Sequence, residues 1–280
     1  MGQASARSMP SERRTARLGR CARRIAEPGP GGRAPASTEI SQTCDSLFAA
    51  MTGRDLRTAR VTKGLSQVDA AVRLGVSQPY IAMLEGGQRR LTPRLTVRVA
   101  KLYGLAPTVV PRSQPDLPVR VDAATLARDV AGLGYPGFAH LRSPTWTPKN
   151  PGDVLLSALA QADLEPRLVE ALPWLVLRYS TLDWTWVVRE AKVRDLQNRL
   201  GFVVTLARQV ATRVADEQKA RALRDLEARL ESSRLAREDT LGRTSLPEAE
   251  RRWLLEHRPD AARHWNLLTD WTADALRYAA

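Results

Sequence analysis

Residues 64–91 read GLSQVDAAVRLGVSQPYIAMLEGGQRRL, and this stretch decides the fold of the chain around it. Ser66, with Asp69 three residues later, forms an acidic capping box, which predicts that a helix begins here. Gly75 ends this helix, because glycine adopts the left-handed backbone conformation that most side chains resist. Ser77 then caps a second helix. The stretch therefore predicts two short helices joined by a tight turn at Gly75.

Apolar spacing assigns an inner and an outer face to each of these helices. On the first helix we expect a buried face formed by Val68, Ala71, Val72 and Leu74. Ala71 must be small, because the two helices cross closely there. On the second helix, Ile81 and Leu84 face inward. The outward positions are then Gln78, Pro79, Ala82 and Met83.

Two further helices flank this pair. The first covers residues 54–63 and ends at Gly64, with Leu56, Ala59 and Val61 on its apolar side. The other starts at Thr92 and ends at Gly104, and its apolar stripe consists of Leu95, Val99 and Leu102. Prolines at positions 107, 111, 115 and 118 then indicate a linker.

The four helices carry a specific residue pattern. It runs Leu56-x-x-Ala59-Arg60, Gly64-Leu65-Ser66-Gln67, Ala71, Gly75-Val76-Ser77-Gln78, Ile81, Leu84-Glu85, Gly87 and Arg89. With this pattern, residues 54–105 resemble the helix-turn-helix family of phage repressors, Cro proteins and xenobiotic-response-element (XRE) transcriptional regulators. The resemblance implies a five-helix-type domain that binds double-stranded DNA. Members of the family usually bind as homodimers to two half-sites about one helical turn apart.

The resemblance and the side-chain chemistry together predict the DNA contacts. The third helix would lie in the major groove, where the Gln78 amide suits adenine. The resemblance implies that Gln67 touches phosphate and braces Gln78, and that Arg60 and Glu85 form a partly buried structural ion pair. Tyr80 either donates to a phosphate or packs against the turn, and Met83 either meets a thymine methyl or is simply exposed. The expected DNA-binding residues are Gln67, Ser77, Gln78, Pro79, Tyr80, Ala82, Met83, Arg89, Arg90 and Arg94.

Two positions on the third helix depart from the commoner family pattern. Pro79 and Ala82 are apolar where many relatives carry polar side chains. Few hydrogen-bonding groups remain on this face, so specificity should depend on Gln78, on apolar contacts and on DNA shape. The N–H groups at the start of the fourth helix would hold phosphate together with Arg89, Arg90 and Arg94.

The formal charge of +13 is concentrated around this segment. Residues 51–112 carry 11 basic and 3 acidic side chains, whereas residues 113–280 carry 24 and 23. A basic domain beside a neutral body is typical of a nucleic-acid-binding protein. No apolar run reaches the ~18 residues needed to span a membrane. Cys21 and Cys44 form no disulfide framework, so we expect a cytoplasmic protein that is nucleoid-associated when bound to DNA.

The sequence divides into four parts. Residues 1–50 are rich in Arg, Ala, Ser, Gly and Pro, which predicts a disordered basic tail. We hypothesise that this tail is dispensable, and another possibility is that Met51 is the biological start of translation. The DNA-binding domain covers residues 51–112 and a linker covers residues 113–122. A helical domain for dimerisation, sensing or partner binding covers residues 123–280.

The C-terminal domain reads as almost wholly helical, which makes the fold class all-α. We expect helices at residues 123–132, 151–162, 165–179, 184–199, 202–236, 247–257 and 262–278. Pro173 should kink or split its helix. All seven tryptophans lie in this domain, where they either fill the core or line a ligand pocket or partner groove. The polar residues 195–199 form either an interhelical hydrogen-bond network or part of a pocket.

We expect no catalytic residue, metal or cofactor in this domain. It does not have the β-rich character of the self-cleaving serine–lysine domains that some regulators of the family carry. It also contains neither a His-Glu-x-x-His motif nor a Gly-rich phosphate loop. The nearest approach to a metal site is the cluster of Glu256, His257, His264 and Asp270, but Pro259 interrupts the helix that would align it.

The sequence as a whole predicts a sequence-specific transcriptional regulator. We expect a repressor, and one variant of this expectation is an antitoxin that regulates its own operon. The C-terminal domain would form a homodimer, or bind a toxin or a small ligand, without contact to membranes. The alternative is an effector or enzyme, with a metal-dependent nuclease-like C-terminal domain that the helix-turn-helix segment brings to DNA.

Overall fold

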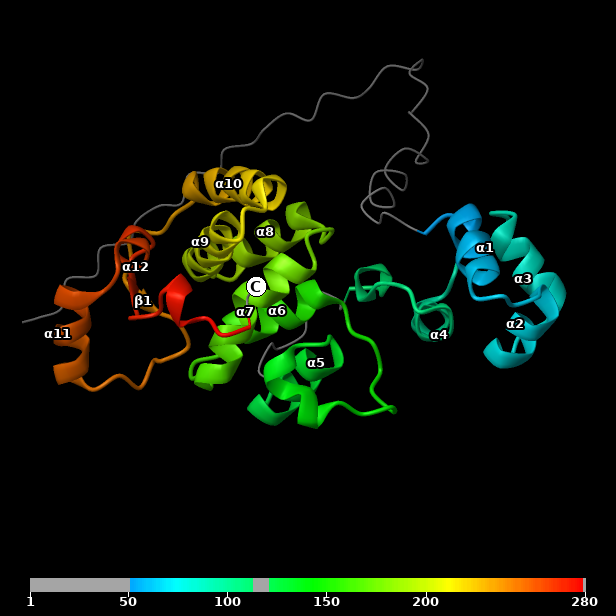
Figure 1. Ribbon diagram of the computed structural model, residues 1–280, viewed down its shortest axis with the longest axis horizontal. Coiled ribbons are helices and arrows are strands. Elements are labelled where there is room, and N and C mark those ends of the chain that lie inside the picture. The colour runs from blue at the N-terminus through cyan, green and yellow to red at the C-terminus, as the bar shows by residue number, and fades with distance from the viewer. Residues whose placement is uncertain (1–50, 113–120, 279–280) are drawn as a thin grey trace, which may run out of the picture. The chain divides into compact units, whose positions relative to one another are not determined.

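A computed structural model describes residues 51–112 and 121–278 (Figure 1). The tail predicted at residues 1–50 and most of the predicted linker lie outside the described residues. Within the described ranges the chain is mostly helical, so the predicted fold class is confirmed. The strands assigned there are β1 (Asp239–Thr240) and β2 (Leu267–Leu268), which pair in parallel. No helix in the described part of the chain is long and apolar enough to cross a membrane.

The first described segment folds into four α-helices. They are α1 (Gly53–Thr62), α2 (Gln67–Leu74), α3 (Gln78–Glu85) and α4 (Pro93–Tyr103). Thr52 and Ser66 begin α1 and α2 with complete capping boxes, in which Asp55 and Asp69 return the hydrogen bond. The fifth helix that the family resemblance implied is here a single 3-10 turn, η2 (Pro107–Val109).

The core of this domain lies between the four helices and is made of small and branched apolar side chains together with one tyrosine. Its buried members are Leu56, Ala70, Ala71, Leu74, Ile81, Leu84, Leu95, Val99 and Tyr103. The prediction that Val68 and Val72 are buried is wrong, because these side chains are 59% and 75% exposed. The side of α2 that meets α3 and α4 is formed by Ala70, Ala71 and Leu74. Because successive residues are about 100° apart around a helix, the two valines point in a different direction.

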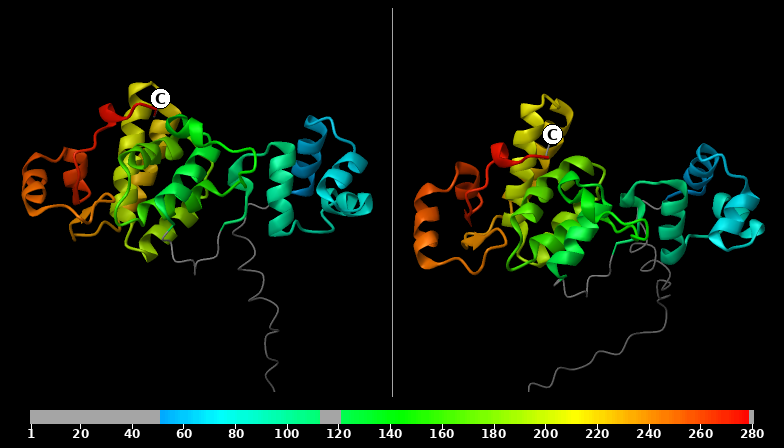
Figure 2. Two further views of the ribbon diagram at one scale, coloured as in Figure 1. Left: turned by 90° about the horizontal axis from the view of Figure 1, so that it is seen from below. Right: turned by 60° about the horizontal axis from the view of Figure 1, so that its bottom comes forward.

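Residues 121–278 build a second and larger hydrophobic core. The helices of this region are α5 (Ala123–Gly132), η3 (Pro136–Leu141), α6 (Pro151–Leu159), α7 (Pro166–Arg178), α8 (Trp184–Val193), α9 (Gln197–Arg213), α10 (Glu217–Glu231), α11 (Glu248–His257), α12 (Asp260–His264) and η4 (Ala273–Ala275). The central element is α9, which contacts α7, α8, α10, α12 and η4 and is buried along most of its length. Figure 2 shows the α7–α10 group from two further directions.

Several predicted helices of this domain are shorter in the structure. The helix predicted at 184–199 breaks at Asp195 (φ 56°), and the one predicted at 202–236 breaks at Ala215 (φ 56°). The prediction of a helix at 262–278 is wrong, because α12 ends at His264 and Asn266 (φ 53°) turns the chain into β2. Pro173 does not split its helix, since α7 runs through it.

The polar residues at the start of α9 form a hydrogen-bond network. The Asn198 amide donates to Leu235 O at 2.8 Å and accepts from Leu235 N–H at 2.8 Å. Arg199 holds Asp239 through two bonds of 2.7 and 2.8 Å and also donates to the carbonyl of Leu159 at 2.7 Å. Of the two alternatives left open for residues 195–199, the structure shows a hydrogen-bond network. It is made by Asn198 and Arg199 mainly with the chain that leads from α10 into β1, rather than between helices.

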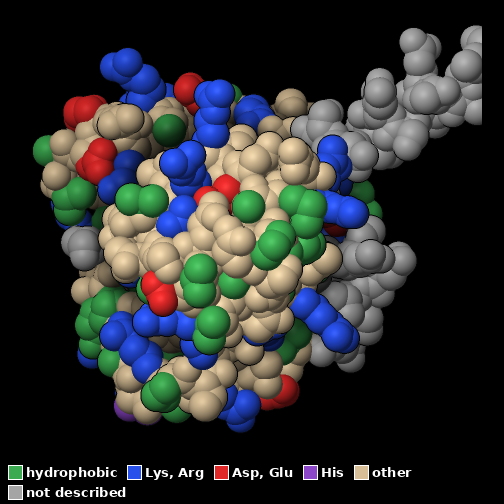
Figure 3. All heavy atoms as spheres, turned by 90° about the vertical axis from the view of Figure 1, so that its right-hand side faces the viewer, with side chains coloured by type: hydrophobic (Ala, Val, Ile, Leu, Met, Phe, Trp, Pro, Cys, Tyr) green, Lys and Arg blue, Asp and Glu red, His purple; other side chains and the backbone are tan. Residues whose placement is uncertain are grey.

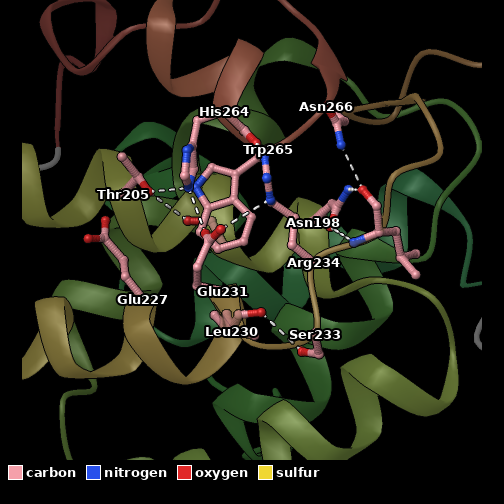
Figure 4. A network of polar contacts seen from close by, with 12 residues as sticks. Asn198, Thr205, Glu227, Leu230, Glu231, Ser233, Arg234, His264, Trp265 and Asn266 are labelled. Atoms are coloured by element: carbon pink, nitrogen blue, oxygen red, sulfur yellow. Dashed lines mark hydrogen bonds and ion pairs between the residues drawn. The ribbon is translucent and has the colours of Figure 1, made fainter.

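Tryptophan in this domain mainly fills the core. Trp265 is 1% exposed, and its indole N–H donates to Thr205 Oγ1 at 2.8 Å (Figure 4). Its ring lies against Gly201, where an added Cβ would come within 2.5 Å of the ring. Trp253 is different, because it is 50% exposed and stacks on His257.

Candidate nucleic-acid interface

The turn between α2 and α3 has the geometry that the sequence predicts. Gly75 adopts a left-handed conformation (φ 57°, ψ 43°), and Val76 N–H donates to Ala71 O at 3.0 Å. Ser77 then caps α3, accepting from Tyr80 N–H at 3.4 Å. The Arg98 guanidinium of α4 lies beside the turn, 3.1 Å from where a Cβ on Gly75 would be. Sequence reasoning missed this contact, because nothing local to α4 signals it.

A buried ion pair joins α1 to α3. Arg60 Nε donates to Glu85 Oε1 at 2.6 Å and Arg60 Nη2 donates to Glu85 Oε2 at 3.0 Å. The two side chains are only 9% and 4% exposed. Arg60 Nη1 also donates to Leu65 O at 2.6 Å, which ties in the chain between α1 and α2. This is the pair that the family resemblance implied.

Gln67 extends the ion pair towards the surface. Its amide nitrogen donates to Glu85 Oε2 at 2.9 Å, and its amide oxygen accepts from Gln78 Nε2 at 2.7 Å. Burial raises the pKa of the Glu85 carboxyl, but hydrogen bonds from Arg60 and Gln67 outweigh it and bring the pKa below its ordinary value. Glu85 is therefore ionised at neutral pH, and an unbroken polar chain leads from it to the first residue of α3.

The outcome of this chain is a fixed orientation for Gln78. One of its two amide hydrogens is used on Gln67, which leaves one N–H donor and the carbonyl oxygen for another partner. Gln78 is exposed, so these two groups are available at the surface. One donor beside one acceptor matches the N7 and N6–H₂ groups of adenine in the major groove.

The remaining predicted residues of α3 present an apolar surface. Pro79 and Ala82 are exposed and Met83 is half-buried, on the side of the helix opposite the buried Ile81 and Leu84. Tyr80 is half-buried and packs against the domain core, and its contact with a phosphate stays a prediction.

Most of the basic side chains of the domain lie at its surface. Arg89, Arg90 and Arg94 are all exposed, on the segment between α3 and α4 and in the first turn of α4. Figure 3 faces the α1–α4 side of Figure 1 and shows Lys and Arg side chains spread over this surface.

Each acidic residue of this domain has a partner within it. Asp55 accepts from Thr52 and Asp69 accepts from Ser66 in the two capping boxes, and these hydrogen bonds lower the pKa of both carboxyls. Glu85 is paired with Arg60. The acids thus serve the fold, and the exposed arginines around α3 and α4 give the surface its positive charge.

The histidines predicted as the nearest approach to a metal site have separate partners. His257 stacks on Trp253 with 4.6 Å between ring centroids, and its Nδ1 lies 2.9 Å from Trp253 O. His264 Nε2 lies 2.7 Å from Glu231 Oε2, so that it links α12 to α10 (Figure 4). Over residues 51–112 and 121–278, no group of three or more His, Cys, Asp or Glu side chains is placed to hold a metal ion.

Beside this link lies an open cleft of about 490 Å³ between α9, α10 and α12. Arg208 and Glu227 line it and bind each other at 2.7 Å. His264 and the edge of Trp265 also contribute to its wall. The cleft is large enough for a small organic molecule.

Comparison with known proteins identifies the first domain. A family model described as a helix-turn-helix domain matches residues 53–112, about a fifth of the chain. Searches of curated proteins and of solved structures give no significant match. The left-handed turn at Gly75, the caps of α2 and α3 and the family match agree, and residues 53–112 are therefore a helix-turn-helix domain of the XRE and Cro type, for which DNA is the partner.

Proposed function

We propose that the protein is a sequence-specific repressor of transcription that binds its operator as a homodimer. The observation that carries this proposal is the polar chain from Arg60 through Glu85 and Gln67 to Gln78. This chain of hydrogen bonds orients the side-chain amide of Gln78, the first residue of α3, in the absence of DNA. A domain that bound DNA only through its charge would have no use for such an oriented group.

In the proposed complex α3 lies in the major groove. Gln78 Oε1 accepts from adenine N6 and the free N–H of Nε2 donates to adenine N7. Arg89, Arg90 and Arg94 bind phosphates on either side, and Gln67 makes a further phosphate contact. The two kinds of contact have different roles, because phosphate contacts position the domain on DNA whereas Gln78 recognises the base sequence.

The C-terminal domain supplies dimerisation and regulation in this proposal. Its nearly balanced charge argues against a second DNA-binding surface. The cleft between α9, α10 and α12 supports a small effector molecule as the regulating ligand. If the protein is an antitoxin, the C-terminal domain binds a toxin in place of a small effector molecule. The proposal assigns neither a catalytic residue nor a cofactor.

The test is selection of binding sites from random duplex DNA by the full-length protein. We expect two half-sites about one helical turn apart, each with an adenine at one constant position. Gln78→Ala should weaken binding to the selected site by about 1–3 kcal/mol and remove the preference for that adenine. Gln88→Ala is the matched control, because it removes an exposed glutamine that lies outside α3.

Two results would contradict the proposal. One is a selected pool with no preferred sequence. The other is a Gln78→Ala variant that keeps the adenine preference, which would show that the reading face has been assigned to the wrong residues.

A further inference from the structure

We propose that α3 recognises the 5-methyl group of pyrimidines, so that the protein distinguishes thymine from uracil and 5-methylcytosine from cytosine. This inference rests on the proposed function, because it requires α3 to lie in the major groove. It goes beyond that function by naming the chemical feature of the DNA that the larger part of the reading face binds.

The geometry of α3 defines that part of the face. Successive residues of an α-helix are about 100° apart, so the buried Ile81 and Leu84 fix the inward direction. Pro79, Ala82 and Met83 then surround the opposite, outward direction. Pro79 and Ala82 are exposed and Met83 is half-buried. They offer carbon and one thioether sulfur, and none of them carries a strong hydrogen-bonding group.

Gln78 lies at the edge of this surface. Its amide is held towards α2 by the 2.7 Å bond to Gln67, so its hydrogen-bonding groups serve one flank of the helix. Base pairs facing the rest of α3 meet carbon. Every base pair placed against carbon loses water from its major-groove donors and acceptors without gaining a partner, so these groups favour neither A·T nor G·C pairs there and the methyl group makes the difference.

The apolar group that a base pair offers in the major groove is the C5 methyl of thymine. A cytosine methylated at C5 carries the same group at the same position. Burying one methyl group is worth about 0.8 kcal/mol, which corresponds to about a fourfold change in Kd. When both half-sites of a dimer contribute, the effect is about fifteenfold.

The experiment uses the wild-type, full-length protein and the tightest duplex from the selection described above. Each thymine of one half-site is replaced in turn by deoxyuridine, which removes the methyl group and leaves the hydrogen-bonding groups unchanged. At one or two adjacent positions we expect binding to weaken about fourfold. With cytosine placed at those positions, 5-methylcytosine should bind about fourfold tighter than cytosine.

Variants assign the effect to α3. Met83→Gln keeps the length of the side chain and replaces the thioether with an amide, and Ala82→Ser adds one hydroxyl group. At least one of these variants should bind the thymine and uracil duplexes equally. Arg89→Ala is the control, because it should weaken binding to both duplexes and leave their ratio unchanged.

The outcomes separate this inference from the proposed function. If every deoxyuridine duplex binds as tightly as the thymine duplex, methyl recognition is refuted while operator binding stands. A thymine preference that both variants and Pro79→Ser all retain would also refute it, because the methyl contact would then come from residues outside the apolar face of α3. If selection yields no preferred duplex, the proposed function fails and the inference fails with it.

Discussion

Replacing Glu85 with alanine should strongly destabilise the helix-turn-helix domain and leave the C-terminal domain folded. Glu85 is 4% exposed in its side chain and accepts from Arg60 and Gln67. Its removal leaves the Arg60 guanidinium, 9% exposed, with the carbonyl of Leu65 as its remaining partner among the contacts described above. A buried cation without a counter-ion is strongly disfavoured.

The expected loss is large relative to the stability of the domain. Breaking one partner of a buried ion pair costs about 3–5 kcal/mol. A domain of this length is stable by about 3–9 kcal/mol, at roughly 0.05–0.15 kcal/mol per residue. Glu85→Ala therefore leaves the domain with a free energy of unfolding between about −2 and +6 kcal/mol, so it should unfold at much lower urea than the wild type. Combining Arg60→Met with Glu85→Leu should recover much of the loss, because apolar side chains often replace a buried pair at little cost.

The distribution of tryptophan provides the assay. All seven tryptophans lie at or beyond Trp146, so their fluorescence reports on the C-terminal domain. Far-UV circular dichroism reports on both domains. In urea, the part of the dichroism change that comes from the helix-turn-helix domain should move to lower urea in Glu85→Ala, while the fluorescence midpoint stays in place. Glu248→Ala, at a glutamate with a 73% exposed side chain, is the matched control and should change neither signal.

Acid provides a second readout with a definite sign. The folded-state pKa of Glu85 lies below the ordinary 4.5, so its contribution is present above pH 4.5 and is lost as the pH falls through the folded-state value. The stability difference between wild type and Glu85→Gln should therefore shrink below pH 4.5. This account of the ion pair would be refuted if the fluorescence midpoint of Glu85→Ala moved to lower urea as far as the dichroism does. It would also be refuted if the stability difference between wild type and Glu85→Gln grew in acid.

Three further predictions follow from the structure. Arg89→Ala should weaken binding to all DNA sequences alike and reduce the slope of log K against log salt by about 1, measured by titration at several salt concentrations. Gly201→Ala should destabilise the C-terminal domain by about 1–3 kcal/mol, because the added Cβ overlaps the Trp265 ring, and tryptophan fluorescence should shift its urea midpoint. Val72→Lys should change stability by less than about 0.5 kcal/mol, since the side chain is 75% exposed; a loss of several kcal/mol in thermal unfolding would contradict the exposed position.

The first domain was predictable because its signals are local. A cap and its acidic partner lie three residues apart at Ser66, and the left-handed turn falls on a glycine at position 75. The chain from Arg60 to Gln78 joins residues up to 25 positions apart, and it was anticipated through the resemblance to a known family. Burial of Val68 and Val72 was wrongly predicted because α2 has two adjacent apolar arcs, and only the contacts with α3 and α4 decide between them.

The C-terminal domain was less predictable where its chain turns without glycine. Asp195, Ala215 and Asn266 adopt positive φ angles, and each ends a stretch that reads as continuous helix. Such conformations are held by tertiary contacts rather than by local preference. The pairing of β1 with β2 joins residues 28 positions apart, and of the two strands β2 lies where the sequence predicts helix. Short-range periodicity carries no information about such a pairing.

The hydrogen bond between Gln78 and Gln67 also affects the entropy of recognition. An exposed glutamine normally samples many rotamers, and immobilising such a side chain on binding costs about 0.5–1.5 kcal/mol. Gln78 has given up part of this freedom during folding, so less remains to be lost when DNA binds. The same restraint makes the side chain less adaptable, because it cannot turn to satisfy a different base without breaking its bond to Gln67. Preorganisation at this one residue would therefore strengthen binding to the correct site and increase the penalty for a wrong one.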